Sequence, residues 1–323
     1  MKNQNLFIRC FIKKKLLSSL AVTAHSNVRL QVKQPKEAKR HTILVFLNKF
    51  QITMRKGYIA LWALVALLMA ACQNKPQGTK TAGNGISCAA MFDTLRIDKQ
   101  FMLDTLDANS PALKIDMELL VPGNVAPDVA GNMNTSISYA TFGYEGLTIA
   151  EAADSLVNSM KSEYLELRDD YINEKAVNPD APWFNNYYTL HCSASEGRNG
   201  CICYVADYEI YSGGAHPSST ISCVNIDAKT GKEIALQDIF APYTDELLTD
   251  RLTDRLAQQN GVKGLEGLKE IDYLIFSDMY VTNNFILGKD SIFFLYNNYE
   301  IAPYYKGRSR IGFDYDELKD LLK

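Results

Sequence analysis

The sequence predicts an α+β fold in which antiparallel sheets and packed helices form two small domains. Runs rich in Tyr, Val, Ile, Thr and Cys are separated by glycine-containing turns, which is typical of antiparallel strands. Other segments repeat apolar residues at helical spacing. The strand-like runs and the helices occur in blocks rather than in strict alternation, which favours α+β over a parallel α/β fold.

The first 71 residues differ in charge from the rest. Residues 1–53 contain eleven Lys and Arg but one acid, Glu37. Residues 72–323 contain 21 Lys and Arg against 36 Asp and Glu, which leaves a net charge of −15. Such a negative chain is unsuited to neutralising phosphates, so we expect no nucleic-acid partner.

Residues 54–71 have the organisation of a lipoprotein signal peptide. Arg55 and Lys56 precede an apolar run from Ile59 to Met69, and the small residues before Cys72 complete a lipobox-like sequence. The apolar run is shorter than the ~20 residues that a membrane span needs. We therefore expect the Cys72 sulfur to carry the lipid, and residues 1–53 to be upstream sequence from a misplaced start codon. The alternative is a basic cytoplasmic extension before a signal anchor.

The elements of the exported part follow in order. Residues 72–104 are expected to be the lipidated cysteine and a flexible tether, because 73–90 are polar and rich in Gly, Thr, Asn and Gln. The first α+β domain is expected at 105–215. It begins with a strand near Leu113, and a T-x-x-E capping box then starts a helix that runs from Ile149 to about Tyr171.

Three strands and a second domain complete the prediction. The strands form an antiparallel meander over Asn185–Ser195, Cys201–Tyr211 and Ser218–Asp227. The second domain is expected at 216–323. Its elements are a helical turn over Leu236–Phe240, an amphipathic helix after Thr244, a loop over 260–270, a hairpin of Asn284–Leu287 with Ser291–Tyr296, a strand over Arg308–Phe313 and a C-terminal helix over Tyr315–Leu322.

Two long motifs resemble a known pair of bacterial envelope domains of originally unknown function. They are SGGAHP…NIDAKTGKEIALQDIF, from Ser212 to Phe240, and FFLYNNYEIAPYYKG…IGFDYDELKDLL, from Phe293 to Leu322. The family pair forms the extracellular part of a lysozyme-sensing anti-sigma factor. It also stands beside the catalytic domain of a peptidoglycan deacetylase, and alone in lipoproteins of Gram-negative gut anaerobes. The resemblance covers about residues 105–322 and implies an N-terminal deacetylase-associated domain followed by a C-terminal domain with the YEIAPYYKG signature.

The resemblance also implies what this chain does. In the anti-sigma factor the region binds lysozyme, and in the deacetylase the chemistry belongs to a separate metal-binding domain whose Asp and His motif this sequence lacks. We therefore expect no catalytic residue, no metal and no cofactor.

His216 lies in a conspicuous turn motif. Gly213 and Gly214 permit a tight reversal between strands, and Pro217 restricts the residue before it. The imidazole is either a ligand contact or part of a structural turn that bonds nearby backbone. A general base or a metal ligand would need partners in defined geometry.

Tyr299, Tyr304 and Tyr305 surround Pro303 in the second motif. Tyrosines supply broad amphipathic contacts, so an exposed cluster suits recognition of a glycan or a protein. The alternative is an ordered loop that covers the end of a sheet. Trp183, Tyr187 and Tyr188 are expected to pack in the core or on a sheet face, outside this cluster.

Five cysteines remain after Cys10 and Cys72 are set aside: Cys88, Cys192, Cys201, Cys203 and Cys223. We interpret them first as buried thiols. A turn centred near Arg198 would place Cys192 opposite Cys203, so one bridge between those two is the second interpretation. A metal site is the third, because C-x-C spacing is poor for zinc.

Taken together, the sequence predicts a lipid-anchored binding protein of the cell envelope that recognises lysozyme or a peptidoglycan-related ligand without catalysis. One alternative is a glycan hydrolase or deacetylase that uses His216 with Asp207 or Glu209. Another is a sensor that passes ligand occupancy to an envelope partner. The expected partners are the membrane, through the lipid on Cys72, and lysozyme, a glycan or an envelope protein. The residues after Cys72 lack an acidic surface-export signal, which favours the periplasmic side of the outer membrane.

Overall fold

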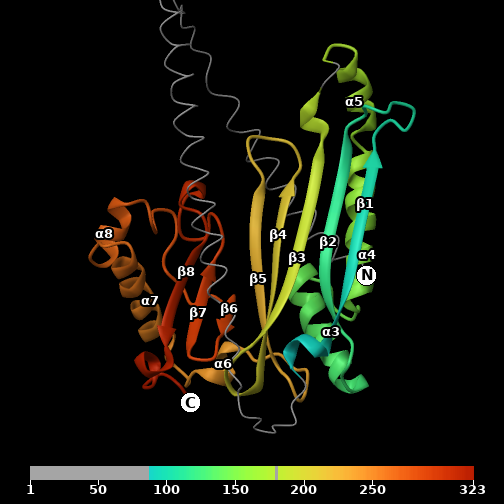
Figure 1. The fold of residues 1–323 in the computed structure, drawn as a ribbon. Coiled ribbons are helices and arrows are strands. Elements are labelled where there is room, and N and C mark those ends of the chain that lie inside the picture. Colours follow the sequence, from blue (N-terminus) through green and yellow to red (C-terminus); the bar gives the residue numbers. More distant parts are fainter. Residues whose placement is uncertain (1–86, 179–180) are drawn as a thin grey trace, which may run out of the picture. The chain divides into compact units, whose positions relative to one another are not determined.

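The fold of the chain is given by a computed structural model that describes residues 87–178 and 181–323. The expected upstream extension 1–53, the signal peptide 54–71 and the lipid-bearing Cys72 lie outside the described residues. The described part contains a five-stranded sheet and a three-stranded sheet, each with helices beside it (Figure 1). This arrangement confirms the predicted α+β class. No helix in the described ranges has both the length and the apolar character that crossing a bilayer requires.

The five-stranded sheet runs in the order β1-β2-β3-β4-β5. Its strands are β1 (Phe92–Met102), β2 (Ala112–Pro122), β3 (Asn186–Glu196), β4 (Cys201–Tyr211) and β5 (Ser218–Asp227). The predicted meander of β3, β4 and β5 is confirmed, since β4 pairs antiparallel with both neighbours. The β2–β3 pair is parallel, which the sequence did not indicate. A parallel pair needs a long crossover, and the helices between β2 and β3 supply it.

The crossover contains α3 (Pro127–Phe142), α4 (Ile149–Leu165) and α5 (Arg168–Lys175). The predicted capping box starts α4: the Glu151 N–H donates to Thr148 Oγ1 at 3.3 Å, and the Thr148 N–H donates to the Glu151 carboxylate at 2.9 Å. The helix ends at Leu165 rather than near Tyr171, because a short-range bond from the Leu167 N–H to the Tyr164 carbonyl closes the last turn at 3.1 Å.

One face of the five-stranded sheet is covered by α3 and α4 (Figure 1). Met117 and Leu119 of β2 are fully buried there with Met133 and Ile137 of α3. Of the intervening residues on the opposite face of β2, Lys114 and Asp116 are exposed and Glu118 is half-buried. The period-two pattern therefore gives this sheet one helix-covered face and one face without helices.

The remaining elements surround the three-stranded sheet, whose order is β6-β7-β8. They are α6 (Leu236–Ile239), α7 (Asp245–Gln259), α8 (Gly264–Glu270), β6 (Phe285–Leu287), β7 (Ser291–Tyr296) and β8 (Ser309–Asp314). Short 3₁₀ turns lie at Cys88–Met91, Pro182–Phe184, Arg198–Gly200, Tyr304–Lys306 and Tyr315–Leu318. The loop expected over 260–270 contains α8, because Leu268 is fully buried in the second core. The expected C-terminal helix is reduced to the last 3₁₀ turn.

Two of the expected boundaries differ from the structure. Residues 92–102 were expected in the flexible tether, but they form β1, which pairs with β2 from Phe92 to Met102 and buries Phe92 and Ile97. The division between domains was expected at 215/216. The five-stranded sheet instead continues through β5, because Ser218 pairs with Ile210 and the pairing runs on to Asp227.

Asparagine side chains join the outer edge of β5 to the second sheet, along a contact that we call the seam. The Asn225 amide accepts from the Leu287 N–H and donates to the Phe285 carbonyl, both at 2.8 Å. The Asn297 amide accepts from the Ile221 N–H at 2.7 Å and donates to the Ile221 carbonyl at 3.1 Å. A side-chain amide has the same donor and acceptor as a peptide unit. Asn225 therefore satisfies backbone groups of β6, and Asn297 satisfies backbone groups of β5, as a neighbouring strand would.

Candidate functional site

The two conspicuous motifs of the sequence meet at one place. The ring of His216, from the turn between β4 and β5, stacks on the ring of Tyr304 with centroids 3.8 Å apart and planes 19° apart. The Tyr299 hydroxyl lies 3.4 Å from His216 Nε2, and the rings of Tyr299 and Tyr304 are 5.7 Å apart. We call His216, Tyr299 and Tyr304 the His216 cluster. It brings together three of the four residues predicted to bind a ligand.

Two glycines allow the turn between β4 and β5 to reverse tightly and to lie close to the Trp183 carbonyl. Gly213 and Gly214 have φ values of 82° and 109°, which other residues rarely adopt. A Cβ atom on Gly213 would also lie 3.1 Å from the carbonyl oxygen of Trp183. The Tyr211 hydroxyl donates to the Gly214 carbonyl at 3.0 Å and holds the turn against its strand. The tight reversal expected from this motif is therefore present.

The hydrogen bonds of His216 define its tautomer. Nδ1 lies 2.8 Å from the Pro217 carbonyl, which can only accept, so Nδ1 carries the proton. In the neutral ring Nε2 is then an acceptor that faces the Tyr299 hydroxyl. The Pro217 carbonyl also accepts from the Tyr304 hydroxyl at 3.2 Å. One carbonyl thus holds both members of the stack.

Neither carboxylate considered as a partner for His216 contacts it. Asp207 forms a two-pronged ion pair with Arg308, with distances of 2.7 and 3.1 Å. Glu209 accepts from the Tyr187 hydroxyl at 2.5 Å, and this hydrogen bond raises the pKa of Tyr187 to about 12. Within the described ranges, no carboxylate is hydrogen-bonded to His216 or paired with it.

Tyr299 and Tyr305 differ in their surroundings. Tyr299 is 60% exposed and has a left-handed backbone with φ 70°, an uncommon conformation for a large side chain. Tyr305 is 67% exposed, but its hydroxyl donates to Asp272 rather than to the cluster. That hydrogen bond to a carboxylate raises the pKa of Tyr305. The structure therefore separates the fourth predicted residue from the other three.

Other aromatic residues near the turn agree only in part with what the sequence predicts. Tyr187 stacks on Tyr211 with ring centroids 5.8 Å apart, and both are half-buried. Trp183, expected in the core or on a sheet face, is 46% exposed, whereas Tyr188 is buried as expected. Tyr211 was not among the predicted site residues, although it lies directly before the SGGAHP motif.

All five described cysteines are buried free thiols, which confirms the first interpretation. Cys192 lies opposite Ala206, and Cys203 lies opposite Ser195, so the expected register for a Cys192–Cys203 bridge is wrong. Burial raises the pKa of Cys192 to about 11 and that of Cys223 to about 12. No group of three or more His, Cys, Asp or Glu in the described ranges has the arrangement of a metal site.

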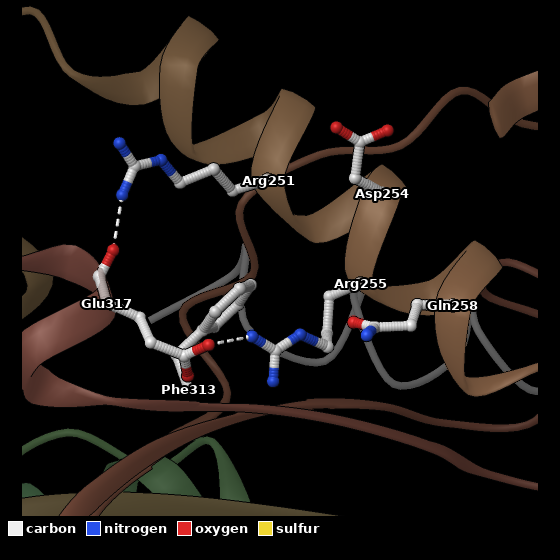
Figure 2. Close-up of a pocket in the computed structure, with 6 residues that line it drawn as sticks. All are labelled: Arg251, Asp254, Arg255, Gln258, Phe313 and Glu317. Carbon is white, nitrogen blue, oxygen red and sulfur yellow. Dashed lines mark hydrogen bonds and ion pairs between the residues drawn. The ribbon is translucent and has the colours of Figure 1, made fainter.

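A groove of about 230 Å³ lies between α7 and the end of the chain (Figure 2). Two arginines line it. Arg251 donates to the Glu317 carbonyl and to the Asp320 carboxylate, the latter at 2.6 Å. Arg255 donates to the Glu317 carboxylate and, at 3.0 Å, to the Gly312 carbonyl. Both guanidinium groups are therefore occupied by protein partners. They link α7 to the C-terminal turn, and neither is left unpaired for a charged ligand.

Comparisons with known proteins found one family match and similar crystal structures. Residues 237–316 match the DUF3298 family, described as a protein of unknown function. No protein with a curated description matches. A crystal structure of a DUF3298 family member from Bacteroides fragilis NCTC 9343 is 26% identical, with a TM-score of 0.65, and the match covers 72% of this chain and 93% of that one.

A second DUF3298 family structure, from Pseudomonas aeruginosa PAO1, is 16% identical with a TM-score of 0.48; the match covers 72% of this chain and 94% of that one. The matched residues 237–316 begin within α6 and end within the 3₁₀ turn after β8, so they contain α7, α8 and the whole three-stranded sheet. This segment of the chain is therefore a DUF3298 domain.

Proposed function

We propose that this chain is a lipid-anchored binding protein of the cell envelope that holds its ligand at the His216 cluster without acting on it chemically. The observation that carries the proposal is the stack of the exposed His216 on the half-buried Tyr304, with the exposed Tyr299 beside it. Aromatic side chains with polar edges contribute much contact area at a small entropic cost, which is why they are enriched in recognition surfaces.

Contacts within the protein hold the His216 cluster in place. The Pro217 carbonyl accepts hydrogen bonds from both His216 and Tyr304. The ion pair of Arg308 with Asp207 ties the loop after Tyr304 to β4. A surface that is already ordered loses less entropy on binding, which favours affinity.

The contacts of His216 favour binding over proton transfer. A general base is usually oriented by a carboxylate or another acceptor on its second nitrogen and has its first nitrogen free for substrate. In His216 the Pro217 carbonyl orients Nδ1 as it would in a base, but Nε2 is not free, because it faces the Tyr299 hydroxyl at 3.4 Å. No described carboxylate is paired with the ring. This arrangement supports a structural and ligand-contacting role rather than catalysis.

Lysozyme is the first partner that we propose, with a peptidoglycan-related ligand as the other. The support is the resemblance to the extracellular region of the lysozyme-sensing anti-sigma factor, whose two-domain organisation we also propose for this chain. The charge of −15 over residues 72–323 would attract a basic protein and raise its association rate.

The partner is tested with the full chain purified in detergent and hen lysozyme as the probe. Salt should mainly slow association, because the Debye length falls from about 10 Å at 0.1 M to about 3 Å at 1 M. Tyr304→Ala should mainly speed dissociation, and Tyr139→Ala, a change to an exposed tyrosine of α3, should do neither. Binding no tighter than to an unrelated protein of equal negative charge, at physiological salt, would remove lysozyme and leave the peptidoglycan-related ligand.

The anchor is tested separately. Cells grown with labelled palmitate should label the wild-type protein but not Cys72→Ala, and mass spectrometry of the mature protein should find no peptide from residues 1–71. Recovery of peptides from residues 10–50 would contradict the processing that we propose.

A further inference from the structure

A second groove, of about 630 Å³, lies where three turns meet. The turns are the one between β3 and β4, the one between β6 and β7, and the 3₁₀ turn after β8. The lining residues are Gly197, Arg198, Asn199, Lys289, Asp290, Asp314, Tyr315 and Asp316. Residues 197–199 come just before β4, and His216 follows its other end, so the groove and the His216 cluster are separate sites.

Arg198 is the positive group of this groove. Its guanidinium lies 3.9 Å from the centroid of the Tyr315 ring, and the Tyr315 hydroxyl is held by the Gly288 carbonyl at 2.8 Å. Within the described part of the chain Arg198 has no ion pair, unlike Arg251 and Arg255 of the first groove. A guanidinium stacked on a ring keeps the N–H groups at its edge available, and these suit a carboxylate.

The negative groups are on the two turns beside Arg198. Asp314 accepts a hydrogen bond from the Ser291 hydroxyl at 2.7 Å. The other positive residue of the groove, Lys289, is already paired with Glu196 at 3.2 Å. Asp290 and Asp316 also line the groove, and neither forms an ion pair with any described residue. The groove therefore combines one guanidinium with three carboxylates that have no partner of opposite charge among the described residues. Of the three, Asp314 is engaged by the Ser291 hydroxyl, and no described side chain is hydrogen-bonded to the carboxylate of Asp290 or Asp316.

We propose that this groove binds a zwitterionic ligand, a free amino acid or a short peptide with free termini. Its carboxylate would bind Arg198, and its ammonium group would lie between Asp290 and Asp316. A simple anion would be repelled by the three carboxylates, and a simple cation would be repelled by the guanidinium, so a ligand with both charges fits best. The volume is within the usual range for small-molecule sites.

The test uses the full chain in detergent and calorimetric titration with alanine and with alanyl-alanine. Either probe should bind in the millimolar range, and the tighter one assigns the groove to free amino acids or to peptide termini. Amidation of the carboxylate and acetylation of the amine should each weaken binding by about tenfold, because each removes a charge-assisted hydrogen bond.

Two arginines allow a matched comparison. Arg198→Met should weaken binding by about tenfold and make it insensitive to amidation of the ligand. Arg310→Met should leave binding unchanged, although Arg310 also stacks on a ring, that of Phe293 at 3.7 Å, outside the groove. The joint change Asp290→Asn with Asp316→Asn should instead make binding insensitive to acetylation.

Unchanged melting temperatures will show that the variants are folded, and Arg198→Lys, which keeps the charge, should bind with intermediate affinity. Absence of binding by the wild type at millimolar concentrations would overturn the proposal. So would equal affinity of Arg198→Met and Arg310→Met, or equal affinity for the free and the blocked ligands.

Discussion

His216 and Tyr304 form a parallel ring stack between two loops that belong to different sheets. The centroid distance of 3.8 Å is close for two rings, and both residues bond to the same acceptor, the Pro217 carbonyl. The stack therefore fixes the turn between β4 and β5 against the loop between β7 and β8. A change at either ring should affect both the local stability and any ligand held there.

The first prediction concerns how much the ring stack of His216 and its hydrogen bonds each contribute to stability. His216→Phe keeps an aromatic ring and should cost little stability, whereas His216→Ala removes the stack and should cost about 1 kcal/mol. Both should weaken ligand retention if Nε2 contacts the ligand. Urea denaturation measures the stability, with His191→Ala, an exposed histidine of β3, as the control. Full ligand retention by both variants would restrict His216 to a structural role.

The second prediction concerns Asn225 in the seam. Asn225 is 2% exposed, and its loss would leave the Leu287 N–H and the Phe285 carbonyl without their partner. We expect Asn225→Ala to lower the free energy of unfolding by about 2–6 kcal/mol, because each of the two buried unsatisfied groups costs about 1–3 kcal/mol. Asn132→Ala, which removes one exposed bond to the Thr230 carbonyl, should cost less than about 1 kcal/mol. Equal effects of the two changes would contradict the role of the seam.

The third prediction concerns pH and Glu317. The Asp314 N–H and the Arg255 guanidinium both donate to this carboxylate and hold its pKa below the ordinary value of 4.5. Because the pKa is lower in the folded state, the carboxylate stabilises the protein at pH values above its ordinary pKa. This stabilisation is lost as the pH falls through the lowered pKa of the folded state.

Glu317→Gln should therefore destabilise the protein at pH 7, and its difference from the wild type should shrink below pH 4.5. Denaturation curves across the pH range measure it. Glu266→Gln, at an exposed position 3.8 Å from Lys269, serves as the control. A difference between Glu317→Gln and the wild type that is constant with pH would show that the carboxylate charge is not responsible.

The fourth prediction concerns the thiols. Because all five described cysteines are free and buried, reductant should leave the melting temperature unchanged. An alkylating reagent should label these cysteines slowly in the native protein and completely after unfolding. Mass spectrometry of the labelled peptides measures both. A peptide pair joined by a disulfide from the native protein would refute the prediction.

The fifth prediction compares two glycines. A Cβ atom at Gly197 would lie 2.1 Å from the Leu287 carbonyl oxygen and 2.8 Å from the Cys203 sulfur, so Gly197→Ala should destabilise the protein by about 2 kcal/mol or more. A Cβ atom at Gly131, within α3, would meet nothing within 4 Å. Gly131→Ala should stabilise by about 0.5–1 kcal/mol, since alanine favours the helix. Thermal unfolding of both variants measures the opposite signs, and destabilisation by both would contradict the clash at Gly197.

Some elements could not be read from the sequence because their formation depends on distant partners. β1 is an edge strand with exposed Asp98 and Lys99, so its polar composition resembled a tether until β2 was placed beside it. α8 was predicted as a loop because its glycines weaken the local helical signal, whereas the burial of Leu268 in the second core supports the helix. The parallel β2–β3 pair depends on the crossover through α3, α4 and α5, and no local sequence pattern indicates that crossover.

The sequence alone determined the features that short-range chemistry controls. The capping box set the start of α4, alternation and glycine turns set the β3–β4–β5 meander, and Gly213 with Gly214 set the reversal before His216. Only the tertiary structure decided which motifs meet. The stack of His216 on Tyr304, and that of Arg198 on Tyr315, joins residues far apart in the chain. Such contacts depend on how the two sheets pack along the seam, and the packing is a sum of many small interactions that no single segment encodes.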